Sequence, residues 1–378
     1  RRVLLKFRFP FAIPPGCLGT SDTVLPAPVV RRGAFSVAMF KGPTALGSDL
    51  VEADLWKTLC PEALEDLSSL LNEVEMLKAW PIQTLLNIVV LMGKPGNKDS
   101  RPIGLMPMIY RLWAKIRKVE ILDWESANRG PWDAAIRGNS ALRAAILTMF
   151  GEELAKLDKQ EIAKILYDME KFYDYIKIEK LIGEAMELGY PVTILALGIQ
   201  MHLAPRAIKA YECYTMADLP SNSIIAGCVQ SNIFAKILLY RIMQGAMEYD
   251  PRQDLITFVD DIHQSMFGED EDELATDVAN VAIQLADRLV AQGNRISLGP
   301  RGKSVILATK KSIRNAIQRK MLRAGYHLKV VTQAGTTAGV RRPVGVLKGR
   351  IAKAKGRTRR IKVLRRADPN AGTLFNTG

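Results

Sequence analysis

Three aspartates end two short apolar runs that are predicted to be buried strands. Asp168 follows the run at residues 162–167, and the pair Asp260 and Asp261 ends the run at residues 255–259. Carboxylates at the tip of an apolar strand are costly to leave unpaired, and three that converge would suit divalent cations. Mg²⁺ prefers carboxylate, water and phosphate oxygens, and two such ions can hold the attacking and leaving oxygens of a phosphoryl transfer. The structural alternative is an Asp-Asp turn pair and a helix N-cap at Asp168.

The elements expected around these aspartates are helices and short strands in mixed order. Apolar residues spaced three and four apart indicate helices, and short β-branched or apolar runs bounded by Gly, Pro or Asp indicate strands. One helix or a helical pair is predicted at residues 50–77. Further helices are predicted at residues 108–121, 141–157, 178–188, 231–247 and 269–291, and strands at residues 84–92, 162–167, 193–197, 255–259 and 304–308. This order indicates a mixed α/β or α+β fold.

The charge of the chain is divided unevenly along its length. Its 378 residues are 48% hydrophobic and 24% charged, which suits a globular protein and excludes a wholly disordered chain. Residues 1–287 hold 30 Lys and Arg against 38 Asp and Glu, whereas residues 288–367 hold 23 Lys and Arg and no acid. A basic arm on an acidic body favours nucleic acid as the partner, because each neutralised phosphate releases a counterion. The alternative is a solvated basic tail or a targeting patch.

Cysteine usage and hydropathy favour an intracellular protein. Four cysteines lie far apart without any Cys-x-x-Cys spacing, which indicates a reducing compartment and neither a zinc site nor a disulfide framework. We expect no membrane span and no secretory signal peptide, because apolar runs are interrupted by charges. Since the first residue is Arg1, we expect a piece of a longer reading frame with further domains missing.

Three segments around the aspartates resemble the motifs of one enzyme family. Residues 165–174, Ile-Leu-Tyr-Asp-Met-Glu-Lys-Phe-Tyr-Asp, resemble the first catalytic motif of reverse transcriptases, in which an aromatic or bulky residue stands five positions after the Asp. Residues 226–231, Ala-Gly-Cys-Val-Gln-Ser, are similar to the family's glycine–glutamine segment before the palm helix. Residues 258–261, Phe-Val-Asp-Asp, are similar to its aromatic-x-Asp-Asp motif.

Further segments extend the resemblance to the non-LTR, LINE-type retroelements. Lys94-Pro-Gly, Arg101-Pro-Ile-Gly-Leu and Tyr110-Arg111-Leu resemble the fingers of these enzymes. Gly302-Lys303-Ser304 stands where their lysine-bearing motif would fall. The order and spacing agree over residues 44–310.

The resemblance implies a right-hand polymerase of the α+β class with four parts. These would be an irregular lead-in at residues 1–48, fingers at residues 49–160, a palm with an antiparallel sheet and part of the fingers at residues 161–310, and a basic helical thumb at residues 311–378.

The resemblance also implies a role for each matched residue. Asp168, Asp260 and Asp261 would hold two Mg²⁺ ions, with Mn²⁺ able to substitute, and Lys303 would donate a proton to pyrophosphate or cap the sheet edge. Tyr173 would exclude a 2′-hydroxyl and so select deoxynucleotides.

The remaining matched residues would bind substrate. Gln230 would contact the template or the incoming nucleotide, and Lys94, Arg101 and Arg111 would bind the triphosphate. The alternatives are a core aromatic for Tyr173, a polar helix start for Gln230 and surface bases for the other three.

The implied function is an RNA-directed DNA polymerase that extends a DNA primer on an RNA template with dNTPs. It would work in a nuclear or cytoplasmic ribonucleoprotein, and the oligomeric state stays open. One alternative is a catalytically decayed, maturase-like RNA-binding protein, favoured by Ser231 where the family usually has Gly. Another is a viral RNA-dependent RNA polymerase, although those usually carry Gly before Asp-Asp.

Overall fold

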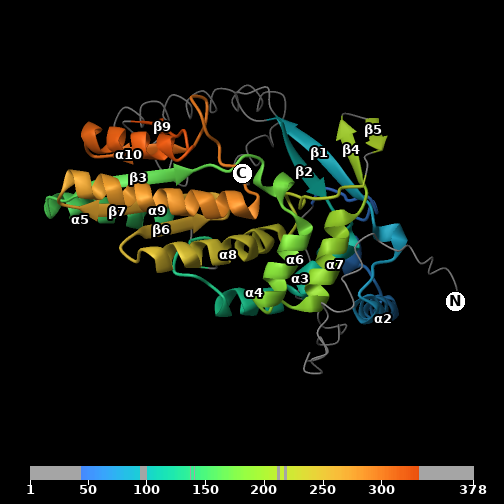
Figure 1. Cartoon of the computed structure of the whole chain (residues 1–378). Coiled ribbons are helices and arrows are strands. Elements are labelled where there is room, and N and C mark those ends of the chain that lie inside the picture. The colour runs from blue at the N-terminus through green and yellow to red at the C-terminus, as the bar shows by residue number, and fades with distance from the viewer. Residues whose placement is uncertain are drawn as a thin grey trace, which may run out of the picture. The chain divides into compact units, whose positions relative to one another are not determined.

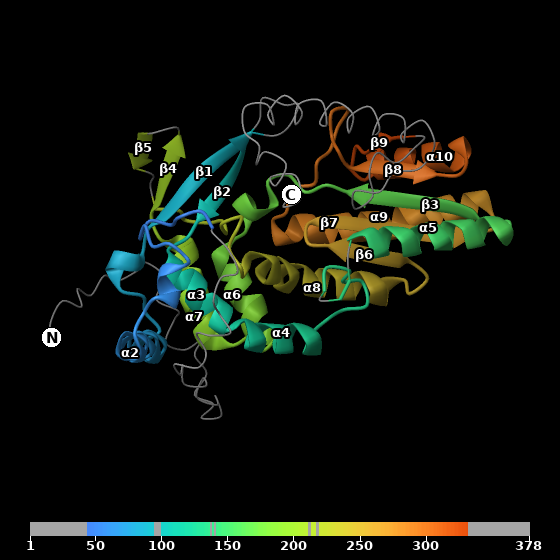
Figure 2. The ribbon, with the colours of Figure 1, turned by 180° about the vertical axis from the view of Figure 1, so that it is seen from behind.

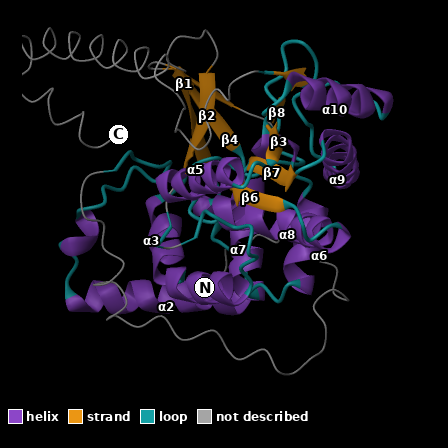
Figure 3. Ribbon diagram, turned by 90° about the vertical axis from the view of Figure 1, so that its left-hand side faces the viewer, coloured by secondary structure: helices purple, strands orange, loops and turns teal. Residues whose placement is uncertain are grey.

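The computed structural model describes residues 44–93, 100–136, 138–139, 141–210, 213–216 and 219–331. Within these residues the chain forms two compact units whose segments alternate along the sequence (Figures 1 and 2). Unit 1 takes the described residues of 1–133, 168–251 and 284–297, and unit 2 takes those of 134–167, 252–283 and 298–378. Each unit has a sheet of its own (Figure 3).

The sheet of unit 2 has five strands in the order β6-β7-β3-β8-β9. Their bounds are β3 (Glu161–Tyr167), β6 (Asp254–Phe258), β7 (Asp261–Gly268), β8 (Val305–Ala308) and β9 (Lys329–Val330). The pairs β6/β7, β7/β3 and β3/β8 are antiparallel, and β8/β9 is parallel. Ala163, Ile165 and Tyr167 alternate with less buried residues along β3, so one face of this central strand faces the core.

Helices α5 (Ala141–Leu157) and α10 (Lys311–Arg323) and the first part of α9 (Glu271–Gln292) complete unit 2. A polar link crosses its core, because the Tyr167 hydroxyl donates to Gln264 Oε1 at 2.9 Å. Ion pairs link the elements of unit 2 at its surface. Lys164 Nζ lies 2.6 Å from Glu152 Oε1 of α5, and Lys310 Nζ contacts carboxylates of both β3 and α9.

The sheet of unit 1 has the strand order β2-β1-β4-β5. Its strands are β1 (Asn87–Gly93), β2 (Ser100–Leu105), β4 (Arg206–Ala210) and β5 (Cys213–Met216). Only the central pair β1/β4 is parallel.

Helices make up most of unit 1. They are α2 (Pro61–Leu77), α3 (Met108–Ile116), α4 (Lys118–Ala127), α6 (Ile178–Glu187), α7 (Val192–Leu203) and α8 (Ser231–Tyr249), with short 3₁₀ turns at Leu55–Lys57, Ile82–Thr84 and Phe172–Tyr175. Edge-to-face packing of Trp80 on Tyr110 and Trp113 fills the core beside α3. A buried guanidinium, Arg117, donates to Glu75 Oε1 at 2.6 Å and so keeps that buried carboxylate paired.

The prediction of an α+β fold is confirmed, and the helices predicted at residues 141–157, 178–188, 231–247 and 269–291 all form, most of them within two residues of the expected ends. The strand predicted at residues 193–197 is wrong, because this segment lies inside α7. Nearly every residue of α7 is buried, so the helix is apolar all round and shows no period by which to recognise it. The single helix predicted at residues 108–121 is two, α3 and α4, with the buried Arg117 between them.

The predicted limits of fingers, palm and thumb stay predictions, because the two units are defined by packing rather than by function. The lead-in up to residue 43 and the thumb beyond residue 331 lie outside the described residues. Among the described helices, none combines the length and apolar composition needed to cross a bilayer.

Candidate active site

Three candidate residues lie at or next to strand termini at the same end of the unit 2 sheet. The last residue of β3, Tyr167, pairs with Ile262 of β7, and Leu166 pairs with Val305 of β8. The end of β3 and the starts of β7 and β8 therefore share one end of the sheet. Asp261 is the first residue of β7, and Lys303 precedes β8 by two residues. Asp168 is the next residue of the chain after Tyr167, at the boundary between the two units.

The hairpin between β6 and β7 carries its aspartate on a strained turn. Phe258 pairs with Asp261, so only Val259 and Asp260 form the connection. Val259 has φ of 60°, and a β-branched residue in this left-handed region is a genuine outlier. Two-residue hairpins with positive φ at the first central position normally take Gly there. Such strain costs about 1–3 kcal/mol and is concentrated at functional sites, which supports a functional role for Asp260.

The chain after β3 is held by a second short strand-like contact in unit 1. The carbonyl of Asp168 accepts the amide N–H of Ser297 at 2.8 Å, and Met169 forms an antiparallel bridge with Ile296. The Glu170 carboxylate accepts a hydrogen bond from the hydroxyl of Ser297 at 3.2 Å. These contacts fix the backbone at Asp168 from the C-terminal side.

Tyr173 lies half-buried and linked to the first turn of α8. Its hydroxyl donates to Asn232 Oδ1 at 3.0 Å, and its carbonyl accepts the amide N–H of Ile224 at 3.0 Å. The ring also packs edge-to-face against Phe172. The alternative of a core aromatic is therefore wrong, because Tyr173 is partly exposed and Asn232 is exposed.

The glycine–glutamine segment packs against the segments that resemble fingers. The amide N–H of Gly104 in β2 donates to the carbonyl of Ala226 at 2.9 Å, and Gly227, with φ of 102°, lies beside the Gly104 carbonyl. The Tyr110 hydroxyl and Cys228 Sγ share a hydrogen bond of 3.2 Å, and burial raises the pKa of Tyr110 well above its ordinary value. Segments of unit 1 that are far apart in sequence thus meet at one place.

Gln230 lies in the interior at the start of α8. Its side chain is fully buried, and neither amide atom has a hydrogen-bond partner among the described residues. A methyl group at Gly198 of α7 would stand 2.4 Å from Gln230 Oε1, so the amide packs directly over this glycine. Contact with a nucleotide would need a different side-chain conformation, and that role of Gln230 stays a prediction.

The candidate triphosphate ligands have different surroundings. Arg101 is exposed on β2, opposite Met92 of β1. Arg111 is half-buried, and its guanidinium donates to the carbonyl of Ala45 at 2.7 Å and to Thr44 Oγ1 at 2.6 Å. Burial lowers the pKa of Arg111. Lys94 lies outside the described residues.

The donor chemistry at the strand ends suits Mg²⁺, since carboxylates are its usual protein ligands. As the described side chains are placed, no three of His, Cys, Asp and Glu stand together as a ready metal site. His263, the neighbour of the aspartate pair, is half-buried in β7, and burial lowers its pKa to about 4.

Sequence reasoning missed three residues that position this region. Asn232 holds the Tyr173 hydroxyl. His202 Nδ1 accepts the amide N–H of Ile225 at 2.9 Å, and burial lowers its pKa to about 3, so the imidazole stays neutral. The Asp49 carboxylate accepts the amide N–H of Met108 and so caps α3. Only Asn232 had a sequence signal, because it directly follows the matched segment 226–231.

The chain matches none of the protein-family models with which it was compared, and none of the curated proteins.

Proposed function

We propose that this chain is an RNA-directed DNA polymerase of the non-LTR, LINE-type retroelements, with a right-hand arrangement of fingers, palm and thumb. One observation carries the proposal: strands β3, β7 and β8 share a sheet end at which Asp260, Asp261 and Lys303 lie and from which the chain continues into Asp168. The strained turn at Val259 and the packing of segment 226–231 on β2 support it.

The aspartates would act as metal ligands. Asp168, Asp260 and Asp261 would hold two Mg²⁺ ions, which when bound would supply charge stabilisation for in-line attack of a primer 3′-hydroxyl on a dNTP. The protein itself would contribute by positioning the primer 3′-hydroxyl and the dNTP, because holding two reacting groups in line removes much of the entropic barrier to reaction.

The other matched residues would handle substrate. Tyr173 would lie beneath the sugar and exclude a 2′-hydroxyl, and Arg101 would bind the triphosphate through its guanidinium. Lys303 would give a proton to the leaving pyrophosphate. RNA template and DNA primer would be the macromolecular partners.

The test is Mg²⁺-dependent extension of a DNA primer on an RNA template by the full chain. Asp260→Asn should abolish extension and leave binding of primer–template unchanged. The matched control is Asp254→Asn, the same change at the other end of strand β6, which should retain extension. Extension by the Asp260→Asn variant at the wild-type rate would contradict the proposal.

A second candidate is a polymerase-like RNA-binding protein without catalysis. The buried and unpartnered amide of Gln230 favours it, because this side chain is not presented to a nucleotide. In that case the wild-type chain would bind RNA tightly and extend no primer with either Mg²⁺ or Mn²⁺.

A further inference from the structure

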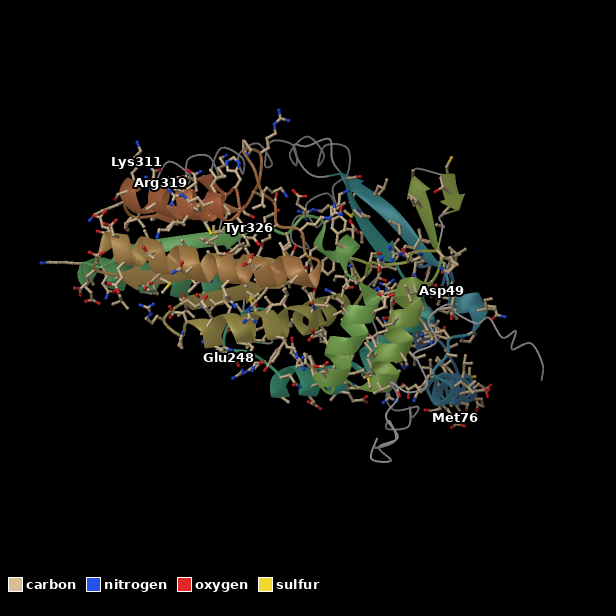
Figure 4. All side chains as sticks on the ribbon, viewed as in Figure 1. Asp49, Met76, Glu248, Lys311, Arg319 and Tyr326 are labelled. Carbon is tan, nitrogen blue, oxygen red and sulfur yellow. The ribbon has the colours of Figure 1, made fainter. Side chains whose placement is uncertain are left out.

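Helix α10 has two faces that use their positive charges differently. Ile313, Ile317 and Met321 are buried against the rest of unit 2. On the opposite side Lys311, Arg319 and Arg323 are exposed, and Figure 4 labels the first two. At 100° and 1.5 Å per residue these three span about 18 Å of helix and about a third of its circumference, so they form one continuous outer row.

The cations on the inner side of α10 are already bonded within unit 2. Lys310 pairs with Glu161 and Glu271, and the Arg314 guanidinium donates to the carbonyl of Ala308 at 2.9 Å. Lys320 Nζ donates to Thr276 Oγ1 at 3.0 Å.

The outer row is different: within the described part of the chain the side chains of Lys311, Arg319 and Arg323 make no hydrogen bond and no ion pair. Residues 288–331 also contain 11 Lys and Arg and no Asp or Glu, so no acid of this stretch balances the row.

Lys311 stands against the helix dipole, whereas Arg323 in the last turn is favourably placed. Acidic residues normally occupy the first turn of a helix, whereas α10 has none there and begins with Lys311. The Glu271 carboxylate of α9, which accepts Lys310 Nζ and the Ser312 hydroxyl, offsets part of that cost. Lys311 keeps this unfavourable position, and no side chain of the row has a partner among the described residues, which indicates an external anion.

We propose that the outer row of α10, formed by Lys311, Arg319 and Arg323, binds successive phosphates of a nucleic-acid backbone. The assignment rests on the nucleic-acid partner of the proposed function and names the surface that binds it. A membrane surface fits less well, because helices that lie on membranes pair their basic face with a broad face of Trp, Phe or Leu. The exposed side of α10 offers only Leu322.

The test is binding of a labelled RNA–DNA hybrid by the full chain at several salt concentrations. The outer variant is Lys311→Gln/Arg319→Gln/Arg323→Gln. The control, Lys118→Gln/Arg129→Gln/Lys159→Gln, removes three exposed cations elsewhere, so both variants lower the net charge from +14 by the same amount. The outer variant should bind about tenfold more weakly or worse, and its slope of log affinity against log salt should flatten by about 2–3. The control should bind like the wild type.

Equal affinity and slope in the two variants would overturn the assignment. A third variant, Lys311→Arg/Arg319→Lys/Arg323→Lys, keeps the charges and should bind within about threefold of the wild type. If it instead loses binding as the outer variant does, the loss comes from a damaged fold and the assignment fails. Weaker binding to phosphatidylserine vesicles with unchanged hybrid binding would also overturn it. The assay measures binding alone, so a chain that binds through α10 and extends no primer would contradict only the polymerase proposal.

Discussion

At the residue scale, two polar side chains at the start of α8 have opposite surroundings. The exposed Asn232 accepts a hydrogen bond from Tyr173, whereas the amide of Gln230 is buried without a partner among the described residues. An unpaired buried polar group carries a desolvation penalty of about 1–3 kcal/mol. The two residues are therefore expected to respond to substitution in different ways.

Replacing Gln230 by an apolar residue of similar shape should stabilise the protein. Gln230→Met removes the unpaired amide, so the free energy of unfolding in urea should rise by about 1 kcal/mol. The control is Gln200→Met in α7, whose amide donates to the carbonyl of Lys78 and accepts from Trp80, and which should lose stability. A loss of stability in Gln230→Met would mean that the amide is bonded in solution.

The hydrogen bond between Tyr173 and Asn232 should fix the ring that is proposed to exclude ribonucleotides. Both Tyr173→Phe and Asn232→Ala should lower the preference for dNTPs over NTPs in primer extension several-fold, and the double variant should be no worse than either. Tyr175→Phe is the control, because its hydroxyl accepts from Arg295 instead. Additive effects in the double variant would show that the two residues act separately.

At the element scale, the contact between β2 and segment 226–231 depends on glycine. A Cβ at Gly104 would stand 1.8 Å from Cγ2 of Ile225, so a larger residue requires either β2 or the segment at Ile225 to move. Neither secondary-structure propensity nor hydrophobic periodicity predicts this contact. From the sequence, Gly104 was expected only as part of a matched motif. The partner of a glycine is set by tertiary packing.

Gly104→Ala should destabilise the protein by about 2 kcal/mol or more through overpacking. Ile225→Ala removes the clashing methyl, so the double variant should recover part of the loss relative to the sum of the single changes. Gly93→Ala in the neighbouring strand has open space around the new methyl and should change stability little. Chemical denaturation of the four variants measures this, and equal effects at Gly104 and Gly93 would refute the contact.

The buried His202, which accepts the amide N–H of Ile225, should make the free energy of unfolding depend on pH. Burial lowers the pKa of His202 to about 3, whereas an unfolded histidine titrates near 6.5, so the unfolded state binds more protons as pH falls below 6.5. Stability from this group is full above about pH 6.5 and should fall by about 2 kcal/mol at pH 5.

His202→Gln should reduce the dependence of unfolding free energy on pH between 7 and 5, because the glutamine carbonyl can accept the same amide without titrating. His327→Gln, at an exposed histidine, should keep the wild-type dependence. An unchanged dependence in His202→Gln would show that this imidazole is not buried and neutral.

Long amphipathic helices and strands bounded by turn residues were predicted well from the sequence. Elements that depend on tertiary packing were not predicted correctly. Helix α5 begins and ends at the expected residues 141 and 157. Strands β2, β4, β5, β7 and β9 were not predicted, because they contain Pro, Gly or charged residues or, like β5, are very short, and so depend on pairing with neighbours. Helix α7 was mistaken for a strand because it is apolar on all sides.

For the whole molecule, the proposed function depends on residues that lie far apart in the sequence. The aspartates that follow apolar runs in the sequence predicted which strand ends carry the candidate residues. The strand register places Asp260, Asp261 and Lys303 at the sheet end shared by β3, β7 and β8. The positioning residues Asn232, His202 and Asp49 could not be predicted, since each acts on a segment that only the fold brings near.

The proposed function requires that Asp168 and the pair Asp260 and Asp261 bind the same metal ions. Fe²⁺ can replace Mg²⁺ at oxygen ligands, and with ascorbate and peroxide it cuts the backbone beside the place where it binds. Cleavage of the full wild-type chain, mapped by mass spectrometry, should give cuts near Asp168 and also near Asp260. Both cuts should disappear with excess Mg²⁺ and in Asp260→Asn, and persist in Asp254→Asn. Cutting near only one of the two positions, or an unchanged pattern in Asp260→Asn, would contradict the shared site.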